Sequence, residues 1–111
     1  GKDALDYLAA AAKMSAGAGA FAQFAGVQLV IDNGNVTEAR IGGQAIDPAR
    51  TYRMAINSFM AAGGDGYPRL AGKPSFVDTG FVDADMLKAY ITAQSPIRSS
   101  NFEPGNSVVR R

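Results

Sequence analysis

The spacing of apolar residues predicts a helix at the start of the chain. Residues 3–14 are dominated by alanine, the strongest helix former, and Asp3 can cap their amino end. Apolar side chains recur there every three or four residues, which places them on one face of a helix. These positions are Leu5, Leu8, Ala9 and Ala12. Residues 15–26 are rich in glycine and other small residues, which predicts a tight connector after the helix.

A change to apolar residues at every second position then predicts a β-hairpin. Val27, Leu29 and Ile31 follow this alternation, as expected for a half-buried strand. The next residues, "NG" at 33–34, favour the tight type I′ turn that joins two antiparallel strands. The segment VTEARI returns as the partner strand, and TYRMAI, after a proline-containing turn, is expected to form another strand.

The last third of the chain predicts one more helix and a short strand. The helix covers residues 83–94, with Asp83 as its cap and Pro96 just past its end. Val108 and Val109 can add an edge strand. The residues expected to form the buried stripe of the helix are Met86, Leu87, Tyr90 and Ile91.

Together these elements predict an α+β fold in which helices pack on a mainly antiparallel sheet. The 111 residues suit a single domain with one core, and a composition of 47% hydrophobic and 19% charged residues is typical of a globular chain. The net charge of +1 gives no basis for nucleic-acid binding. No apolar run approaches the length of a membrane span.

The absence of cysteine and histidine restricts the chemistry of the chain most strongly. It excludes disulfides, thiolate nucleophiles, Cys/His metal sites and a histidine general base. Carboxylate-only chemistry stays possible, but a self-contained active site is not expected. The chain also starts inside a helical pattern without an initiator methionine, so we expect it to be part of a longer protein.

The segment NSFMAAGGDGYPRL, residues 57–70, is the main candidate for a binding site. Three glycines surround Asp65, and Phe59 precedes this loop. An aromatic ring can stack on a nucleic-acid base, a carboxylate can accept hydrogen bonds from ribose hydroxyls, and glycine lets a sugar approach closely. The residues alone leave two interpretations open. One is a nucleoside clamp; the other is a structural turn in which Asp65 braces the loop while Phe59 and Tyr67 fill the core.

The segment DPARTYRMAINSFMAAGGDGYP, flanked by GKDALDYL and GFVDADMLKAYI, closely resembles the C-terminal domain of the bacterial periplasmic 5′-nucleotidases, also called UDP-sugar hydrolases. The resemblance runs essentially end to end. It implies that residues 1–111 are most of the C-terminal domain, which binds the nucleotide and sets specificity. The parent would be a periplasmic hydrolase of nucleotide catabolism that cleaves nucleoside 5′-phosphates and UDP-sugars.

The resemblance also implies how the work is divided between two domains. An N-terminal metallophosphoesterase domain, absent from this sequence, would hold two divalent metal ions and the catalytic residues, and would be the partner in cis. The present chain would contain no catalytic residue, no metal ligand and no cofactor, and alone would be inactive. Its ligand would be a nucleotide or nucleoside.

Three residues match the ligand-binding positions of the family. The family sandwiches the base between two phenylalanines, of which the second corresponds to Phe59, and the aspartate that contacts the ribose hydroxyls corresponds to Asp65. Gly19 is the best match for a backbone contact to the base. The first phenylalanine and the phosphate-steering arginines lie upstream in the family, and neither Arg53 nor Arg69 occupies a matching motif.

Two alternatives remain open within this assignment. The parent could be a relative that prefers cyclic nucleotides, since the base-stacking residues alone do not separate the two substrates. The chain could also be a non-catalytic nucleotide-binding or interaction module.

Overall fold

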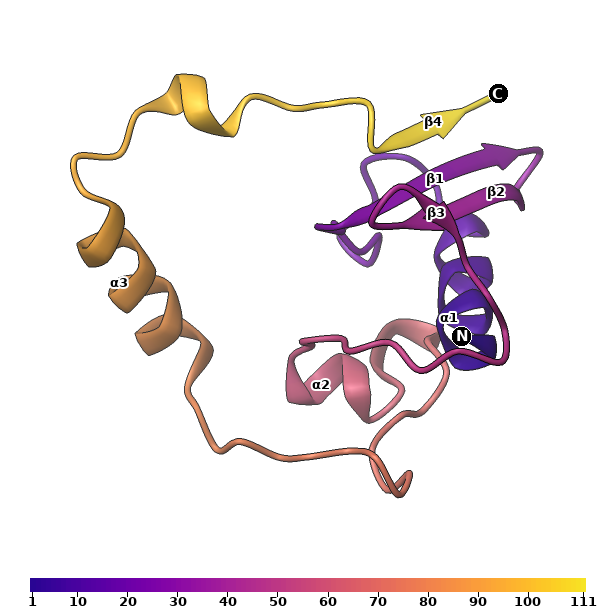
Figure 1. Ribbon diagram of the computed structural model, residues 1–111, viewed down its shortest axis with the longest axis horizontal. Coiled ribbons are helices and arrows are strands. Elements are labelled where there is room, and N and C mark those ends of the chain that lie inside the picture. Colours follow the sequence, from indigo (N-terminus) through magenta and orange to yellow (C-terminus); the bar gives the residue numbers. More distant parts are fainter.

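The computed structural model describes residues 1–111 and combines helices with one mixed sheet (Figure 1). The sheet has the strand order β3-β2-β1-β4. Two of its three strand pairs are antiparallel, and β4 lies parallel to β1. This arrangement confirms the predicted α+β class. The elements are α1 (Lys2–Ala12), β1 (Val27–Asp32), β2 (Asn35–Ile41), β3 (Gln44–Ala45), α2 (Ser58–Ala61), η1 (Gly64–Gly66), α3 (Asp83–Gln94), η2 (Ser99–Phe102) and β4 (Val108–Arg110).

Helix α1 forms where the alanine-rich pattern predicts it and packs against one face of the sheet. Its buried residues are Tyr7, Leu8, Ala11 and Ala12, so the predicted stripe is shifted and Ala9 is exposed. Asp3 does not cap the helix, because Gly1 is the N-cap and no side chain caps that end. The Asp3 carboxylate instead accepts a hydrogen bond from Lys73 Nζ at 2.9 Å, which ties α1 to the segment after the glycine loop.

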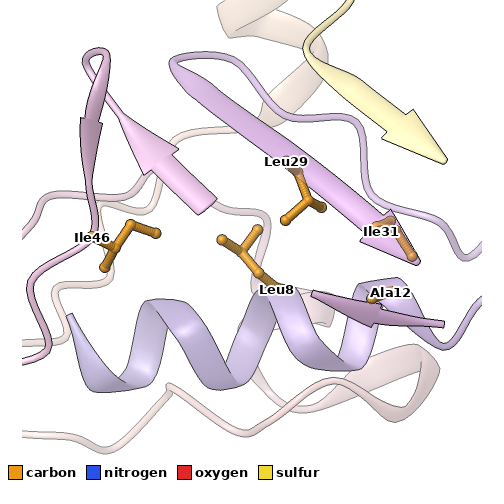
Figure 2. Packing of buried hydrophobic residues seen from close by; sticks show 5 residues of the cluster. All are labelled: Leu8, Ala12, Leu29, Ile31 and Ile46. Atoms are coloured by element: carbon orange, nitrogen blue, oxygen red, sulfur yellow. The ribbon is translucent and has the colours of Figure 1, made fainter. Parts of the chain in front are cut away.

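The predicted hairpin is confirmed, with β1 and β2 joined at Asn33 and Gly34. Both turn residues have positive φ, at 48° and 73°, as a type I′ turn requires. The inward side of β1 and one face of α1 form the core, to which Ile46 contributes from just beyond β3 (Figure 2). The five side chains of this cluster are Leu8, Ala12, Leu29, Ile31 and Ile46.

Residues 51–56 were expected to form a strand, and this prediction is wrong. The segment is extended but belongs to no strand of the sheet. The last strand of the sheet on this side, β3, is only Gln44–Ala45, and residues 51–56 make no backbone hydrogen bond to it. The segment serves another purpose in the structure, as one wall of a pocket described below.

Helix α3 has the predicted bounds, and Pro96 follows its end as expected. Its environment is not the predicted one. The N-cap is Val82 rather than Asp83, and the predicted buried stripe is exposed. Figure 1 shows α3 standing apart from the sheet, reached and left through irregular segments. Helix α3 therefore has the predicted amphipathic pattern, but no other helix or strand of residues 1–111 packs on its apolar face.

Candidate functional site

The glycine loop begins at the end of the short helix α2. Asn57 caps this helix, since its side-chain oxygen accepts a hydrogen bond from the Met60 N–H at 2.8 Å. Beyond the helix, Gly63 and Gly66 adopt positive φ angles of 92° and 81°, and Asp65 also has a positive φ of 58°. Such a conformation is uncommon for a residue with a side chain, although aspartate tolerates it better than most. Backbone strain of this kind often accompanies a functional site.

Phe59 lies on α2, just before this loop, with its ring largely in solvent. The side chain is 60% exposed, and a Cβ added to Gly64 would lie only 2.5 Å from Phe59 Cε1. The absence of a side chain at Gly64 therefore allows the ring to lie directly against the loop backbone. The interpretation in which Phe59 fills the core is wrong for this structure.

Tyr67, by contrast, is buried as the structural-turn interpretation expected, with 4% of its surface exposed. Its ring stacks on that of Tyr7, with centroids 4.4 Å apart and planes at 16°. Its hydroxyl donates a hydrogen bond to the Ala20 carbonyl and accepts one from the Ala22 N–H, both at 2.9 Å. The residue after the glycine loop is thus fixed to the connector.

Asp65 is exposed, and its carboxylate neither accepts a hydrogen bond nor forms an ion pair with any of the 111 residues. The carboxylates of Asp47, Asp78 and Asp83 do accept backbone hydrogen bonds from nearby residues. Asp65 therefore does not brace its own loop. Its negative charge is available to a group outside the chain.

A pocket of about 760 Å³ lies beside the glycine loop. Its main walls are the connector, residues 19–27, and the extended segment of residues 52–57. Asp65 and Gly19 both line it, so the structure brings together two of the three predicted site residues. Phe59 does not line it and lies outside, over Gly64. The volume falls within the range of small-molecule sites.

Sequence reasoning did not foresee the walls of the pocket. Phe21, Phe24 and Tyr52 line it, as does Arg53, which was expected in the middle of a strand. The aromatic content of the connector was the available signal, because two phenylalanines in a glycine-rich segment need an apolar neighbour. Arg69 is exposed and donates a hydrogen bond to the Ala62 carbonyl at 3.3 Å.

An arginine from the last strand holds the connector on its other side. Arg110 places its guanidinium carbon 4.8 Å from the centroid of the Phe21 ring and donates to the Met14 carbonyl at 2.9 Å. A cation over an aromatic ring contributes about 0.5–1 kcal/mol at an exposed site. Strand β4 thereby steadies one wall of the pocket.

No group of three or more acidic, histidine or cysteine side chains is placed to hold a metal ion. No helix of the structure combines the length and the apolar character needed to cross a membrane. The groups that the site offers to a ligand are the exposed ring of Phe59, the unpartnered carboxylate of Asp65 and the backbone of the connector.

The chain is thus an α+β domain with a pocket, of a volume common for small-molecule sites, between its connector and its glycine loop. A family model described as "5′-nucleotidase, C-terminal domain" matches residues 1–72, and the chain belongs to that family.

Similarity to whole proteins extends over nearly the full chain. Protein UshA of Escherichia coli (strain K12) is 51% identical over 108 residues, which cover 97% of this chain and 20% of that protein. Silent protein UshA(0) of Salmonella typhimurium is 48% identical over 108 residues, with the same coverage of 97% and 20%. A 5′-nucleotidase of Vibrio cholerae is 45% identical over 111 residues, which cover 100% of this chain and 20% of that protein. The chain spans about a fifth of the length of these curated relatives.

Proposed function

We propose that this chain binds the nucleoside part of the substrate in a periplasmic enzyme that hydrolyses nucleoside 5′-phosphates and UDP-sugars. One observation carries the proposal. In a member of the 5′-nucleotidase C-terminal domain family, an unpartnered carboxylate, Asp65, lines the same pocket as Gly19, and an exposed aromatic ring, Phe59, lies against Gly64, the residue before Asp65. The relatives named 5′-nucleotidase support the activity of the parent.

The exposed ring of Phe59 would stack on the base. Stacking of a base on an aromatic side chain is worth about 1–3 kcal/mol. The ring is accessible to a base, because Phe59 keeps 60% of its surface in solvent, whereas Tyr67 is buried. Gly64 supports the ring from below, because a side chain there would collide with it.

The Asp65 carboxylate would accept hydrogen bonds from the two ribose hydroxyls. A hydrogen bond to a charged acceptor contributes about 1.5–3 kcal/mol. The carboxylate carries no other partner that would have to be displaced first. Its positive φ, between two glycines, points to a backbone shaped for a contact rather than for a regular turn.

Gly19 would let the base approach the backbone of the connector. Its φ is not positive, and a Cβ added there would meet no atom of the chain within 4 Å. Neither the backbone conformation nor the internal packing therefore requires glycine at this position. Close approach of a ligand does require it.

We assign the chemical step to an N-terminal metallophosphoesterase domain in cis with two divalent metal ions. The residues of this chain offer no cluster that fits such ions, and we assign them no bond-breaking role. When bound, such a metal pair activates water and stabilises the charge that develops on the phosphate. The chain described here would fix the nucleoside, which makes the attack effectively unimolecular.

The test compares two substrates in the whole protein. Phe59→Ala and Asp65→Ala should each lower kcat/KM for AMP by roughly 5- to 150-fold, the loss expected from about 1–3 kcal/mol of binding. Hydrolysis of para-nitrophenyl phosphate, which has neither base nor ribose, should change less than about twofold, because its reaction uses only the metal site. Equal losses for both substrates would show that the two residues are structural.

A further inference from the structure

Two buried tyrosines lie against each other between α1 and the glycine loop. Tyr7 is 2% exposed and Tyr67 is 4% exposed, and their rings are stacked. Their hydroxyls differ sharply. The Tyr67 hydroxyl makes two hydrogen bonds to backbone groups, whereas the Tyr7 hydroxyl is buried without any partner.

The two bonds of Tyr67 join the opposite sides of the pocket. Tyr67 is two residues from Asp65, and its partners Ala20 and Ala22 follow Gly19 in the connector. Both partner residues line the pocket, but Tyr67 itself does not. One hydroxyl therefore spans from the loop that carries the carboxylate to the wall that carries the glycine.

Side chains of the connector pack on the core, and Arg110 lies over the Phe21 ring, but few other hydrogen bonds hold its backbone. Within residues 15–25, the other backbone hydrogen bonds run from the Ala18 N–H to Ser15 and from the Phe21 N–H to Ala18, and both stay inside the connector. The bonds to Tyr67 are thus the hydrogen bonds that join this wall to the end of the glycine loop. The hydroxyl serves a carbonyl and an amide at once, so its loss leaves both without a partner.

We propose that Tyr67 is a positioning residue for nucleoside recognition. Its hydroxyl sets the spacing between the Gly19 backbone and the Asp65 carboxylate, so that base and ribose are contacted at the same time. This inference rests on the proposed function of the pocket. It adds a residue that touches no ligand and acts only through the two walls.

The substitution Tyr67→Phe removes the hydroxyl and keeps the stacked ring. In the whole protein it should raise KM for AMP by about 3- to 10-fold, the factor that corresponds to one ordinary hydrogen bond. Neither kcat for AMP nor the hydrolysis of para-nitrophenyl phosphate should change, because the metal site is untouched. A purely structural role would instead lower both activities together, through loss of folded protein.

Tyr7→Phe is the matched control. It removes a hydroxyl from the other ring of the same stacked pair, but one that bonds to nothing. KM and kcat should equal those of the wild type. If Tyr7→Phe raised KM as much as Tyr67→Phe, the effect would belong to packing and the proposal would be overturned.

Amide hydrogen exchange gives a readout independent of activity. The Ala22 amide should be protected in the wild type and in Tyr7→Phe, and should exchange at least several-fold faster in Tyr67→Phe. Free exchange of the Ala22 amide in the wild type would overturn the proposal without any variant. Should Tyr67→Phe fold poorly, the exchange rate of the Ala22 amide in the wild type still tests the hydrogen bond on which the proposal depends.

Asp65→Ala, measured in the same assays, separates this inference from the proposed function. If Asp65→Ala impairs AMP selectively while Tyr67→Phe behaves as wild type, the Tyr67 proposal is wrong and the proposed function stands. If Asp65→Ala impairs both substrates equally, the nucleoside site is wrong and the Tyr67 proposal fails with it. Selective impairment by both variants supports both.

Discussion

The substitution Gly64→Ala is expected to move the Phe59 ring without unfolding the loop beneath it. A Cβ at residue 64 would lie 2.5 Å from Phe59 Cε1 and 2.6 Å from Cζ. Because carbon atoms attract each other best from about 3.5 Å, the ring would have to retreat by roughly 1 Å or rotate away. Phe59 is 60% exposed and can move into solvent, and the φ of Gly64 is not positive, so alanine fits the backbone.

The stability of the protein should therefore change by less than about 1 kcal/mol, while nucleotide binding should weaken. Displacing a ring that stacks on a base removes up to about 1–3 kcal/mol, or roughly 5- to 150-fold in Kd. Calorimetric titration of the whole protein with a non-hydrolysable AMP analogue measures this loss. Gly105→Ala is the control, because a Cβ there would meet nothing within 4 Å and the residue lies outside the pocket.

A double-mutant cycle decides whether the loss acts through the ring. If Gly64→Ala weakens binding only by displacing Phe59, adding it to Phe59→Ala should cost less than about 0.5 kcal/mol more. Unchanged affinity in Gly64→Ala, or losses that simply add in the double variant, would refute the reasoning.

Three further substitutions test other parts of the account. Gly19→Ala should leave the Tm unchanged, because nothing in the fold requires glycine there, and should raise KM for AMP; an unchanged KM would remove Gly19 from the site. The hydrogen bond from Lys73 lowers the pKa of Asp3 from 3.8. The stability that wild type gains over Asp3→Asn should therefore be present at neutral pH and decline as the pH falls from 3.8 through the lowered pKa; an advantage that does not decline in acid would contradict the pairing. Burial, with Tyr67 nearby, raises the pKa of Tyr7 from 10.0 to about 12, so the stability of the wild type should fall as the pH rises between these values. An equal fall of stability in Tyr7→Phe would show that ionisation of Tyr7 is not its cause.

The local elements of the fold could be predicted because their causes are local. Alanine content specifies α1, the Asn33-Gly34 dipeptide specifies the hairpin, and the bounds of α3 follow from its flanking residues. The predictions that were wrong concern which elements pack or pair with one another. An apolar stripe shows that a helix can be buried but not what lies against it, and α3 has no neighbour in this structure. Likewise, residues 51–56 have a strand-like pattern but make no backbone hydrogen bond to any strand of the sheet.

The candidate site was predictable in part for a similar reason. Asp65 and Phe59 stand out because their chemistry is visible in the glycine loop, and Asp65 and Gly19 do line one pocket. The sequence predicted Tyr67 only as a core residue, and its burial confirms that prediction. Its hydrogen bonds to the connector join residues more than 40 positions apart, and no pattern within either segment reveals such a contact.

A crystal structure of the whole protein with a non-hydrolysable adenine nucleotide tests the central claim most directly. The account predicts the adenine ring stacked on Phe59 and both ribose hydroxyls within hydrogen-bond distance of the Asp65 carboxylate. A nucleotide bound elsewhere, with Phe59 and Asp65 making no contact to it, would contradict the account.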